Sequence, residues 1–458
     1  MKKLRTFAFV LTCLVFIKAN AQDSTDQLVS KWMNDRNVPG MAVAVIQNGK
    51  VLKMKGYGKA NLETGSPVNT ETVFMTASLS KQFIATALIL LVREHKLSLS
   101  DKAADYIDSF PSAWKNITLQ QLLSHTSGII RDPVDYHPYT EQPVMQVIRS
   151  MYGVPMIGQP GEKWLYSNVG YYILAEVITR VSGEPWDRFI AERIFVPAGM
   201  MHTRTVSSKE IVAGRAAGYH YGGGKISNAE NWIAVRPSGA FLSSLADMVA
   251  WDFYLNKLLT KQERELLWTA STLNDGTATN YGLGWYTENF LGHSRMHHDG
   301  QFPGFRAEYE KFSGDSLSII ILANLDNSSL EALSLKTAGL YQPALAAPVF
   351  KTSVRLTSEM IAVNNPLSVE VSIQDQDKSS PGTVVEMEIW DENGKSINKQ
   401  NKQKLDFASG ETKLITFSWT PSAPGTYTVN IGIYGPHWSP DYSWNMKLAS
   451  IRVTGKSD

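Results

Sequence analysis

A nearly continuous apolar run from Phe83 to Val92 sets the strongest limit on how this chain can fold. A helix that is apolar on all sides is stable only where other elements cover each of its faces, so we expect this run to form a central, buried helix. The tetrapeptide Ser78-Leu79-Ser80-Lys81 comes shortly before it. Residues three apart share one face of a helix, so the Ser78 hydroxyl and the Lys81 amine are predicted to lie side by side.

The Ser78 and Lys81 pair has the chemistry of an activated nucleophile. An amine held beside a hydroxyl can take its proton. At the start of a helix, free backbone N–H groups and the helix dipole also favour developing negative charge. The same Ser-x-x-Lys spacing occurs at Ser78, Ser112 and Ser396. Only the copy at Ser78 has an apolar helix behind it, so we interpret the other two as chance.

Residues 1–21 are typical of a secretory signal peptide, with a basic start, an apolar segment from Phe7 to Ile17 and the small-residue cleavage site Ala19-Asn20-Ala21. The apolar segment is too short to span a bilayer, so we expect a periplasmic or secreted chain with no transmembrane segment after cleavage. The single cysteine, Cys13, lies in this segment. The mature chain would therefore have no disulfide, no cysteine-based metal site and no thiol nucleophile.

The length of 458 residues and the hydrophobic content of 43% are ordinary for a globular protein of more than one domain. A net charge of +1 without any basic block argues against nucleic acid as a partner. Within residues 22–342, strand-like segments occur near both ends and helices fill the middle. The predicted strands are 41–46, 51–57, 282–286, 305–312 and 317–323, and the predicted helices include 26–33, 83–92, 171–181, 246–259, 261–270 and 328–340.

This pattern predicts an α+β domain over 22–342, in which one antiparallel sheet is flanked by helices and carries an inserted helical lobe. Asn48-Gly49 joins two strand-like runs and predicts a type I′ hairpin turn, which requires positive φ at both positions. Thr118 and Gln121 have the spacing of a capping box that opens a helix.

Residues 343–352, with Pro343 and Pro348 among alanines, are predicted to be a linker. The rest of the chain, 353–458, alternates in short strands and is predicted to be an immunoglobulin-like β-sandwich. Its predicted strands are 367–373, 384–390, 413–419, 426–434 and 444–453. Tyr427 has the sequence setting of a tyrosine corner. Trp438, Tyr442 and Trp444 could stack on sugars of peptidoglycan or another glycan, although packing within the sandwich is our preferred interpretation.

Two further motifs accompany the serine and lysine. Tyr166-Ser167-Asn168 precedes the predicted helix from Gly170, and His298-Asp299-Gly300 precedes a predicted strand that begins at Phe305. Neither motif is specific by itself, since Tyr-x-Asn recurs at Tyr254 and His-x-Gly at His220. Their order along the chain, after Ser78 and Lys81, gives them weight together.

These motifs and their flanks closely resemble the β-lactamase-related serine hydrolases, in which Ser-x-x-Lys is a catalytic signature. The family includes class C β-lactamases, D-alanyl-D-alanine carboxypeptidases, D-aminopeptidases and esterases. The resemblance covers about residues 25 to 340 and includes L-L-S-H-T-S-G (122–128), P-G-E-K-W-L-Y-S-N (160–168), G-Y-Y-I-L (170–174), Y-G-L-G-W (281–285) and H-D-G-Q-F-P-G-F (298–305).

The resemblance implies a role for each site residue. Ser78 would attack a carbonyl and form an acyl-enzyme, while Lys81 would either keep Tyr166 partly ionised or accept the serine proton itself. Asn168 would offer its amide to the acyl side of the substrate. The backbone N–H groups of Ser78 and Gln301 would form the oxyanion hole, and His298 and Gly300 would belong to the substrate-binding third motif.

The third motif departs from that of class C β-lactamases, which is Lys-Thr-Gly. The chain contains no Lys-Ser-Gly or Lys-Thr-Gly and has His298 at this place, as certain DD-carboxypeptidases and D-aminopeptidases do. A histidine carries less charge than a lysine near pH 7, so efficient β-lactam hydrolysis is not expected. Arg306 could supply that charge or could be a surface residue of a strand.

Each candidate residue also has a purely structural interpretation. Tyr166 could be a core aromatic, Asn168 a helix cap, and His125 is expected to be a structural turn residue. His293, His297 and His298 are close in sequence, but adjacent strand residues face opposite ways and no His-Glu-x-x-His motif is present. We therefore expect no metal and no other cofactor.

The sequence favours a secreted serine hydrolase that acts through a Ser78 acyl-enzyme on an ester, an amide or a D-amino-acid peptide. Its partner would be a small-molecule or peptide substrate. Two alternatives stay open: a class C-like β-lactamase, and a non-catalytic wall-binding or signalling protein that binds glycan through its C-terminal domain.

Overall fold

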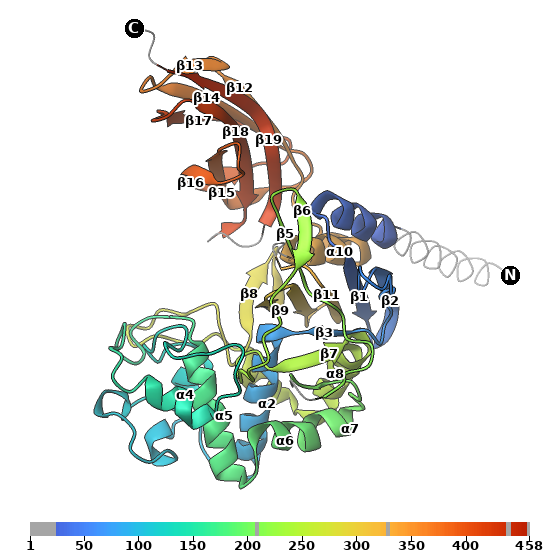
Figure 1. Ribbon diagram of the computed structural model, residues 1–458, viewed down its shortest axis with the longest axis vertical. Helices are drawn as coiled ribbons and strands as arrows, with labels where there is room; N and C mark the ends of the chain where they lie inside the picture. Colours follow the sequence, from blue (N-terminus) through green and yellow to red (C-terminus); the bar gives the residue numbers. More distant parts are fainter. Residues whose placement is uncertain (1–23, 207–209, 327–329, 437–440, 456–458) are drawn as a thin grey trace, which may run out of the picture. The chain divides into compact units, whose positions relative to one another are not determined.

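Six antiparallel strands form the main sheet, in the order β2-β1-β11-β10-β9-β8 (Figure 1). They are β1 Gly40–Gln47, β2 Lys50–Gly58, β8 Tyr286–Phe290, β9 His293–Phe302, β10 Phe305–Phe312 and β11 Leu317–Ala323. The computed structural model describes residues 24–206, 210–326, 330–436 and 441–455. It divides the chain into an N-terminal unit, residues 1–345, and a C-terminal unit, residues 346–458. The predicted signal peptide lies outside the described residues.

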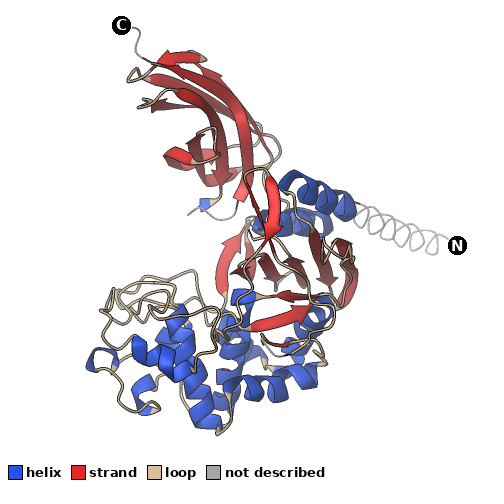
Figure 2. Cartoon of the chain, in the orientation of Figure 1, coloured by secondary structure: helices blue, strands red, loops and turns tan. Residues whose placement is uncertain are grey.

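Both faces of the main sheet are covered. All seven residues of β11 are buried, which a sheet with one solvated face would not allow. Ala42 and Leu322, on one face, belong to the large core that also contains the central helix α2, Ser80–Arg93. The helices α8, Leu245–Leu258, and α10, Glu331–Tyr341, both pack on β11, and Figure 2 shows helices on either side of the sheet.

The helical lobe surrounds α2, which is buried from Ser80 to Leu91 as its apolar sequence predicts. The other α-helices of the N-terminal unit are 24–36, α3 Leu119–Leu123, α4 Val144–Ser150, α5 Asn168–Ser182, α6 Trp186–Ile190, α7 Val196–Ala198 and α9 Lys261–Trp268. Short helical turns are η1 Ala77–Leu79, η2 Ala103–Asp105, η3 Ser112–Trp114, η4 Ala191–Phe195 and η5 Pro343–Leu345. Two small sheets contain β3 Val73–Met75, β4 Arg204–Thr205 and β7 Phe241–Ser244, and β5 Tyr219–Gly222 and β6 Lys225–Asn228.

The C-terminal unit contains one sheet of three strands, β12-β14-β17, and one of five, β13-β19-β18-β15-β16. These strands are β12 Phe350–Leu356, β13 Met360–Ala362, β14 Leu367–Asp375, β15 Ser380–Trp390, β16 Ser396–Phe407, β17 Thr412–Trp419, β18 Gly425–Tyr434 and β19 Asp441–Thr454. Alternate residues of β14 are fully buried, as in a sandwich core. The Tyr427 hydroxyl donates to the Ala423 carbonyl at 3.0 Å, the hydrogen bond of a tyrosine corner.

The α+β fold class with a strand-rich C-terminal region is confirmed, and so are several local predictions. Asn48 and Gly49 both have positive φ, 51° and 70°, in the turn between β1 and β2. The Thr118 hydroxyl accepts from the Gln121 N–H, and the Gln121 side chain accepts from the Thr118 N–H, so the capping box is present. In the Ser-x-x-Lys copy at Ser396, which we interpret as chance, both Ser396 and Lys399 lie on strand β16 and not on a helix.

Two element predictions are wrong at their boundaries, and one strand is missing from the prediction. Residues 282–285 are not strand, because β8 begins only at Tyr286. Strand β9 was not predicted, although it contains His298. Strand β12 begins at Phe350, so the end of the expected linker 343–352 is already part of the C-terminal sheet.

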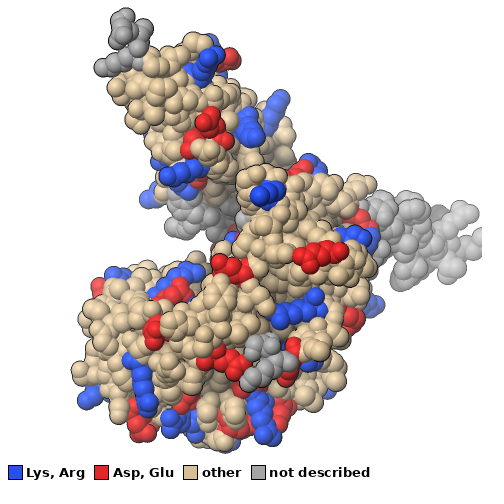
Figure 3. Space-filling model, in the orientation of Figure 1, with Lys and Arg blue, Asp and Glu red and all other residues tan. Residues whose placement is uncertain are grey.

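No helix among the described residues is long and apolar enough to cross a membrane. On the face shown in Figure 3, acidic and basic side chains are interspersed over both units.

Candidate active site

Ser78 lies in the short turn η1 that leads from β3 into α2. The preceding residue, Ala77, is buried and has a φ of 49°, a backbone conformation that non-glycine residues rarely adopt. This turn presents Ser78 at the start of the helical segment, where the first backbone N–H groups have no intrahelical acceptor. Ser78 is partly exposed, whereas its neighbours Ala77 and Leu79 are buried.

Lys81 is fully buried in the first turn of α2, and its amine is shared between two oxygens. The Nζ atom donates to Ser78 Oγ at 3.1 Å and to the Ser238 carbonyl at 2.8 Å. Within the described residues, no carboxylate forms an ion pair with it. Burial, followed by the positive charge of Arg236, lowers the pKa of Lys81 well below its usual value. The amine is therefore poised to be neutral, which is the form that can accept a proton.

Tyr166 stands over the same lysine, with the Lys81 Nζ atom 4.8 Å from the centre of its ring. Its hydroxyl is hydrogen-bonded to Ser78, but burial outweighs this bond and raises the pKa of Tyr166 well above its usual value. The guanidinium of Arg131 packs on the ring at 4.9 Å. Tyr166 is partly exposed, so the interpretation of this residue as a core aromatic is wrong.

His125 supports Tyr166 from behind. Its ring centre is 4.1 Å from that of Tyr166, and it also contacts the rings of Tyr171 and Tyr281. The Nδ1 atom accepts a hydrogen bond from the Ser167 N–H at 3.0 Å. Burial lowers the pKa of His125 well below its usual value. His125 has a φ of 60°, in agreement with the prediction of a structural turn residue. Its ring packs on that of Tyr166, so this turn helps to position the tyrosine.

His298, predicted to belong to the substrate-binding third motif, is fully buried and does not line the cavity at Ser78. The Nδ1 atom contacts the Asp299 carbonyl at 2.6 Å and the Nε2 atom contacts the Tyr281 hydroxyl at 2.9 Å. Because a carbonyl can only accept, Nδ1 carries the proton and Nε2 accepts from Tyr281. Burial lowers the pKa of His298 to about 4, so the ring is neutral at pH 7.

Gly300, the other third-motif residue, is needed for a close approach of two backbones. A Cβ atom built on Gly300 would lie 2.3 Å from the carbonyl oxygen of Thr76, two residues before Ser78. Strand β9 can therefore pass directly beside the turn that carries the serine only if this position is glycine. The residues on either side, Asp299 and Gln301, are exposed.

Asn168 is the first residue of α5, but it is not the helix cap. The Ser167 hydroxyl accepts from the Gly170 N–H and is the cap, so the interpretation of Asn168 as a cap is wrong. The Asn168 side-chain N–H donates to Asp132 Oδ1 at 2.7 Å. Since a carboxylate only accepts, this bond turns the carbonyl oxygen of Asn168 away from Asp132 and leaves it free to accept from a ligand.

Ser78, Tyr166, Asn168 and Gln301 meet in one cavity of about 430 Å³, whereas Lys81 and His298 lie behind its wall. Six of its lining residues lie outside the motifs found in the sequence, namely Arg131, Asp132, Trp232, Arg236, Tyr286 and Asp326. Asp299, Phe302 and Pro303 belong to the 298–305 motif, but the sequence predicts no role for them. Arg131 and Asp132 follow soon after the 122–128 segment, and this proximity was the available signal for them. Arg306 does not line the cavity, and its Nε atom donates to the Asp326 carbonyl at 2.6 Å.

Residues 25–341 match the family model described as Beta-lactamase. The chain belongs to the beta-lactamase family. Penicillin-binding protein 4* of Bacillus subtilis (strain 168) is 28% identical over 326 residues, which are 65% of this chain and 70% of that protein. The chain spans about two thirds of the length of the curated relatives it matches.

Solved structures share the fold of this beta-lactamase family member. An octameric penicillin-binding protein homologue from Pyrococcus abyssi aligns with a TM-score of 0.65 and 17% identity, covering 89% of this chain and 97% of that one. A D-amino acid amidase from Ochrobactrum anthropi SV3 aligns with a TM-score of 0.60 and 19% identity, over 70% of this chain and 98% of that one. These structures show a shared fold, and membership of the β-lactamase-like superfamily rests on the match over residues 25–341.

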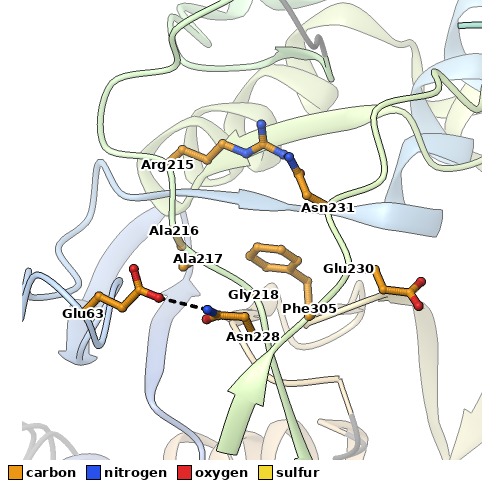
Figure 4. A pocket seen from close by; sticks show the side chains of 10 residues that line it. Glu63, Arg215, Ala216, Ala217, Gly218, Asn228, Glu230, Asn231 and Phe305 are labelled. Atoms are coloured by element: carbon orange, nitrogen blue, oxygen red, sulfur yellow. Dashed lines mark hydrogen bonds between the residues drawn. The ribbon is translucent and has the colours of Figure 1, made fainter. Parts of the chain in front are cut away.

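A second, smaller hollow of this beta-lactamase family member, about 230 Å³, contains none of the predicted site residues (Figure 4). Phe305 lies in its centre, and Arg215 reaches across it to Asn231 at 3.2 Å. On another side, Glu63 accepts a hydrogen bond from Asn228 at 2.9 Å. Its lining residues include no serine, threonine, cysteine or lysine that could act as a nucleophile, so this hollow does not compete with the cavity at Ser78.

Among the histidines weighed for metal binding, His297 lies near Glu288 and Glu331, with one ligand atom of each within 4.8 Å of the others. The buried guanidinium of Arg295 is hydrogen-bonded to both glutamates and to Glu310. This cation neutralises the acids that a metal ion would need. The cluster is an ion-pair network between β8, β9, β10 and α10.

Proposed function

We propose that this chain is a serine hydrolase that forms an acyl-enzyme at Ser78 on an ester, an amide or a D-amino-acid peptide. The observation that carries the proposal is the 3.1 Å hydrogen bond between the Lys81 amine and the Ser78 hydroxyl, with the amine buried. Burying a charged lysine without an ion pair costs free energy of folding, so such a lysine is expected to be neutral. Lysines of this kind are often found at catalytic sites. A neutral amine beside a hydroxyl at a cavity wall is suited to general-base catalysis.

In the proposed reaction, neutral Lys81 accepts the proton of Ser78 as the serine oxygen attacks the substrate carbonyl. Of the two roles considered for this lysine, proton acceptance is favoured, because the raised pKa of Tyr166 makes a tyrosinate the less accessible base. Protonated Tyr166 then hydrogen-bonds to the serine oxygen and can deliver a proton to the leaving group. Tyr166 is then reprotonated by Lys81, which returns the lysine to its neutral form. Water attacks the resulting ester, neutral Lys81 accepts the proton of the water, and the released Ser78 oxygen takes that proton back.

The backbone N–H groups of Ser78 and Gln301 are proposed as the oxyanion hole, worth roughly 3 kcal/mol per donor. The position of β9 beside the serine turn supports this assignment. The carbonyl oxygen of Asn168 is proposed to accept an N–H of the substrate, since its amide nitrogen is already bound to Asp132. Gly300 contributes by permitting this approach, and His298 by holding the Asp299 carbonyl.

A class C-like β-lactamase is the less favoured substrate assignment. Neutral, buried His298 cannot provide the positive charge of the lysine that it replaces. The fold shared with a D-amino acid amidase is compatible with an amide substrate and with a D-amino-acid substrate. A non-catalytic protein is disfavoured because Ser78, Lys81 and Tyr166 are assembled in hydrogen-bond contact.

Secretion, with cleavage after residue 21, also stays a proposal, and so does glycan binding by the C-terminal unit. Of the three aromatics considered for sugar stacking, Trp438 lies outside the described residues. Tyr442 is buried and contacts the ring of Phe350 at 5.9 Å, which suits packing within the sandwich. Trp444 is partly exposed and contacts the ring of Trp390 at 6.3 Å.

Labelling with a fluorophosphonate and with a fluorescent penicillin tests the proposal. We expect the fluorophosphonate to modify Ser78 of the folded protein, as located by peptide mass spectrometry. Ser78→Ala should abolish the label, and Ser112→Ala, in a second Ser-x-x-Lys copy, should keep it. A folded wild-type protein that neither probe labels would contradict the proposal. Turnover of nitrocefin, short acyl esters and D-Ala-D-Ala peptides then separates the substrate classes.

A further inference from the structure

Five charged side chains line the cavity at Ser78, and most of them already have partners. Asp132 Oδ1 accepts from Arg236 at 2.9 Å, and Asp132 Oδ2 lies 3.5 Å from Arg131. Asp326 is bound by the His220 Nδ1 atom at 2.6 Å and by the Gly304 N–H at 2.8 Å. These contacts balance much of the charge of two acids and two arginines.

Asp299 is the exception among these groups. Its carboxylate is half exposed, and the basic groups within 4.0 Å are Arg306 Nη1 and the His298 ring, each at 4.0 Å. That distance is too long for a hydrogen bond. His298 is neutral at pH 7, and Arg306 uses its Nε atom to hold the Asp326 carbonyl. In the described parts of the chain, no group donates a hydrogen bond to the Asp299 carboxylate.

Asp299 lines the same cavity as the nucleophile Ser78. Asp299 and Gln301 flank Gly300 on β9, and successive strand residues alternate in direction, so both point to the cavity while Gly300 contacts the Thr76 backbone. The negative charge of Asp299 raises the pKa of both Lys81 and Tyr166. For Lys81 it opposes the larger effect of burial, which lowers the pKa. For Tyr166 it adds to the larger effect of burial, which also raises the pKa. A group bound at Asp299 would thus lie close to the scissile bond.

We propose that Asp299 binds a cationic nitrogen of the substrate, so that this chain prefers amines over substrates with a carboxylate near the scissile bond. The assignment rests on the proposed Ser78 hydrolase and specifies its substrate class. An ammonium group would gain a charge-assisted hydrogen bond in a sheltered cavity. A substrate carboxylate at the same place would meet a like charge, which disfavours penicillins and peptides with a free C-terminus there.

The ammonium group can belong to the acyl part or to the leaving group, and matched substrates distinguish the two. For the acyl part, D-alanine p-nitroanilide is compared with its N-acetyl and N-succinyl derivatives, which replace the amine by a neutral amide or a carboxylate. For the leaving group, acetylthiocholine is compared with S-butyl thioacetate. Each is measured as kcat/KM with the wild-type full-length chain, with Asp299→Asn, and with Glu63→Gln, which removes one acid at the hollow of Figure 4.

We expect the wild type to prefer the cationic member of at least one series. Asp299→Asn should lower kcat/KM for that member by roughly 10- to 100-fold, the range for one hydrogen bond to a charged group. The same variant should raise kcat/KM for the N-succinyl substrate, and Glu63→Gln should change neither. Opposite changes in one variant cannot arise from general damage to the fold.

Three outcomes would overturn the assignment. A wild type that prefers the carboxylate substrate, or an Asp299→Asn variant that lowers all rates alike, rejects Asp299 as the ammonium site while the Ser78 hydrolase stands. A chain that turns over no member of either series and takes no fluorophosphonate label at Ser78 rejects the hydrolase itself, and the Asp299 assignment with it.

Discussion

At the residue scale, the protonation state of Lys81 decides the direction in which a proton can move in the cavity. The amine must be neutral to accept the Ser78 proton, so the acylation rate should rise with pH as Lys81 loses its proton. Because burial and Arg236 lower the pKa of Lys81, this rise should be complete well below the usual lysine range. Stopped-flow acylation rates from pH 5 to 10 measure the position of the rise.

Removal of the amine should be far more damaging than removal of a surface lysine. Lys81→Met should slow acylation by about 10²- to 10⁴-fold, the usual contribution of a general base. Lys115→Met, in the copy at Ser112, should leave the rate unchanged. Arg236→Gln should move the pH rise of the wild type toward higher pH, because one positive charge near Lys81 is lost. An unchanged pH profile in Arg236→Gln would contradict this electrostatic account.

The lowered pKa of His298 predicts that the stability of the folded chain depends on pH. The folded pKa of His298 is about 4, below the ordinary value of 6.5, so between these pH values the unfolded chain binds a proton that the folded chain excludes. The stabilising contribution is therefore complete above about pH 6.5 and is lost as the pH falls to about 4. Its full size is about 3 kcal/mol.

Urea unfolding at pH 7.5 and pH 4.5 of the wild type and His298→Gln measures this effect. The variant should be less stable at pH 7.5, because the buried Tyr281 hydroxyl loses its acceptor. The difference between the two proteins should shrink at pH 4.5. A difference that stays constant with pH would show that His298 is not kept neutral by its surroundings.

At the element scale, strand β9 determines whether the cavity forms at all. Gly300→Ala would bring a Cβ atom to the Thr76 carbonyl, so the strand must move away from the serine turn. We expect a loss of stability of about 1–3 kcal/mol from overpacking. Acylation should fall by roughly 100-fold, because Gln301 and Asp299 move with the strand. Thermal unfolding and labelling rates measure the two effects.

Gly314→Ala is the matched control for Gly300→Ala. Gly314 has open space around its Cβ position and lies in the turn after β10. It should keep both the stability and the labelling rate of the wild type within a small factor. If Gly300→Ala behaves like Gly314→Ala, the close backbone contact does not set the position of β9.

The same strand shows where sequence patterns reach their limit. The sequence predicts β10 and β11 with their observed bounds, because apolar residues alternate with polar ones along β10 and fill most of β11, and Ser313-Gly314-Asp315 marks the turn between them. Strand β9 was missed because its buried positions include His297, His298 and Arg295. These side chains are stabilised by tertiary partners, such as the three glutamates around Arg295, which no local pattern reveals.

Some residues of the candidate site can be found from the sequence, and others only from the folded chain. Ser78, Lys81 and Tyr166 could be found because they stand in short motifs. Arg236 could not, because it comes from a loop distant in sequence from every motif and meets Asp132 only in the folded chain. The position of His298 was also beyond a sequence pattern, since its neutral, buried state depends on Tyr281.

At the scale of the whole molecule, the chain consists of two units with separate cores. All of the cavity residues belong to the N-terminal unit. The alignment with the penicillin-binding protein homologue from Pyrococcus abyssi covers 89% of the chain, which is more than this unit contains. A strand-rich extension is thus compatible with the fold of the family without supplying any part of the cavity.

Separate cores predict separate unfolding. Calorimetry of the full chain should show two transitions, since residues 346–349 join the units without helix or strand. Covalent acylation of Ser78 should shift only the transition of the N-terminal unit, because contacts of the acyl group are gained in that unit alone. Ser78→Ala treated with the same reagent should show no shift. A single transition, or an equal shift of both, would mean that the two units unfold as one cooperative body, and the C-terminal sandwich would then contribute to the stability of the active site.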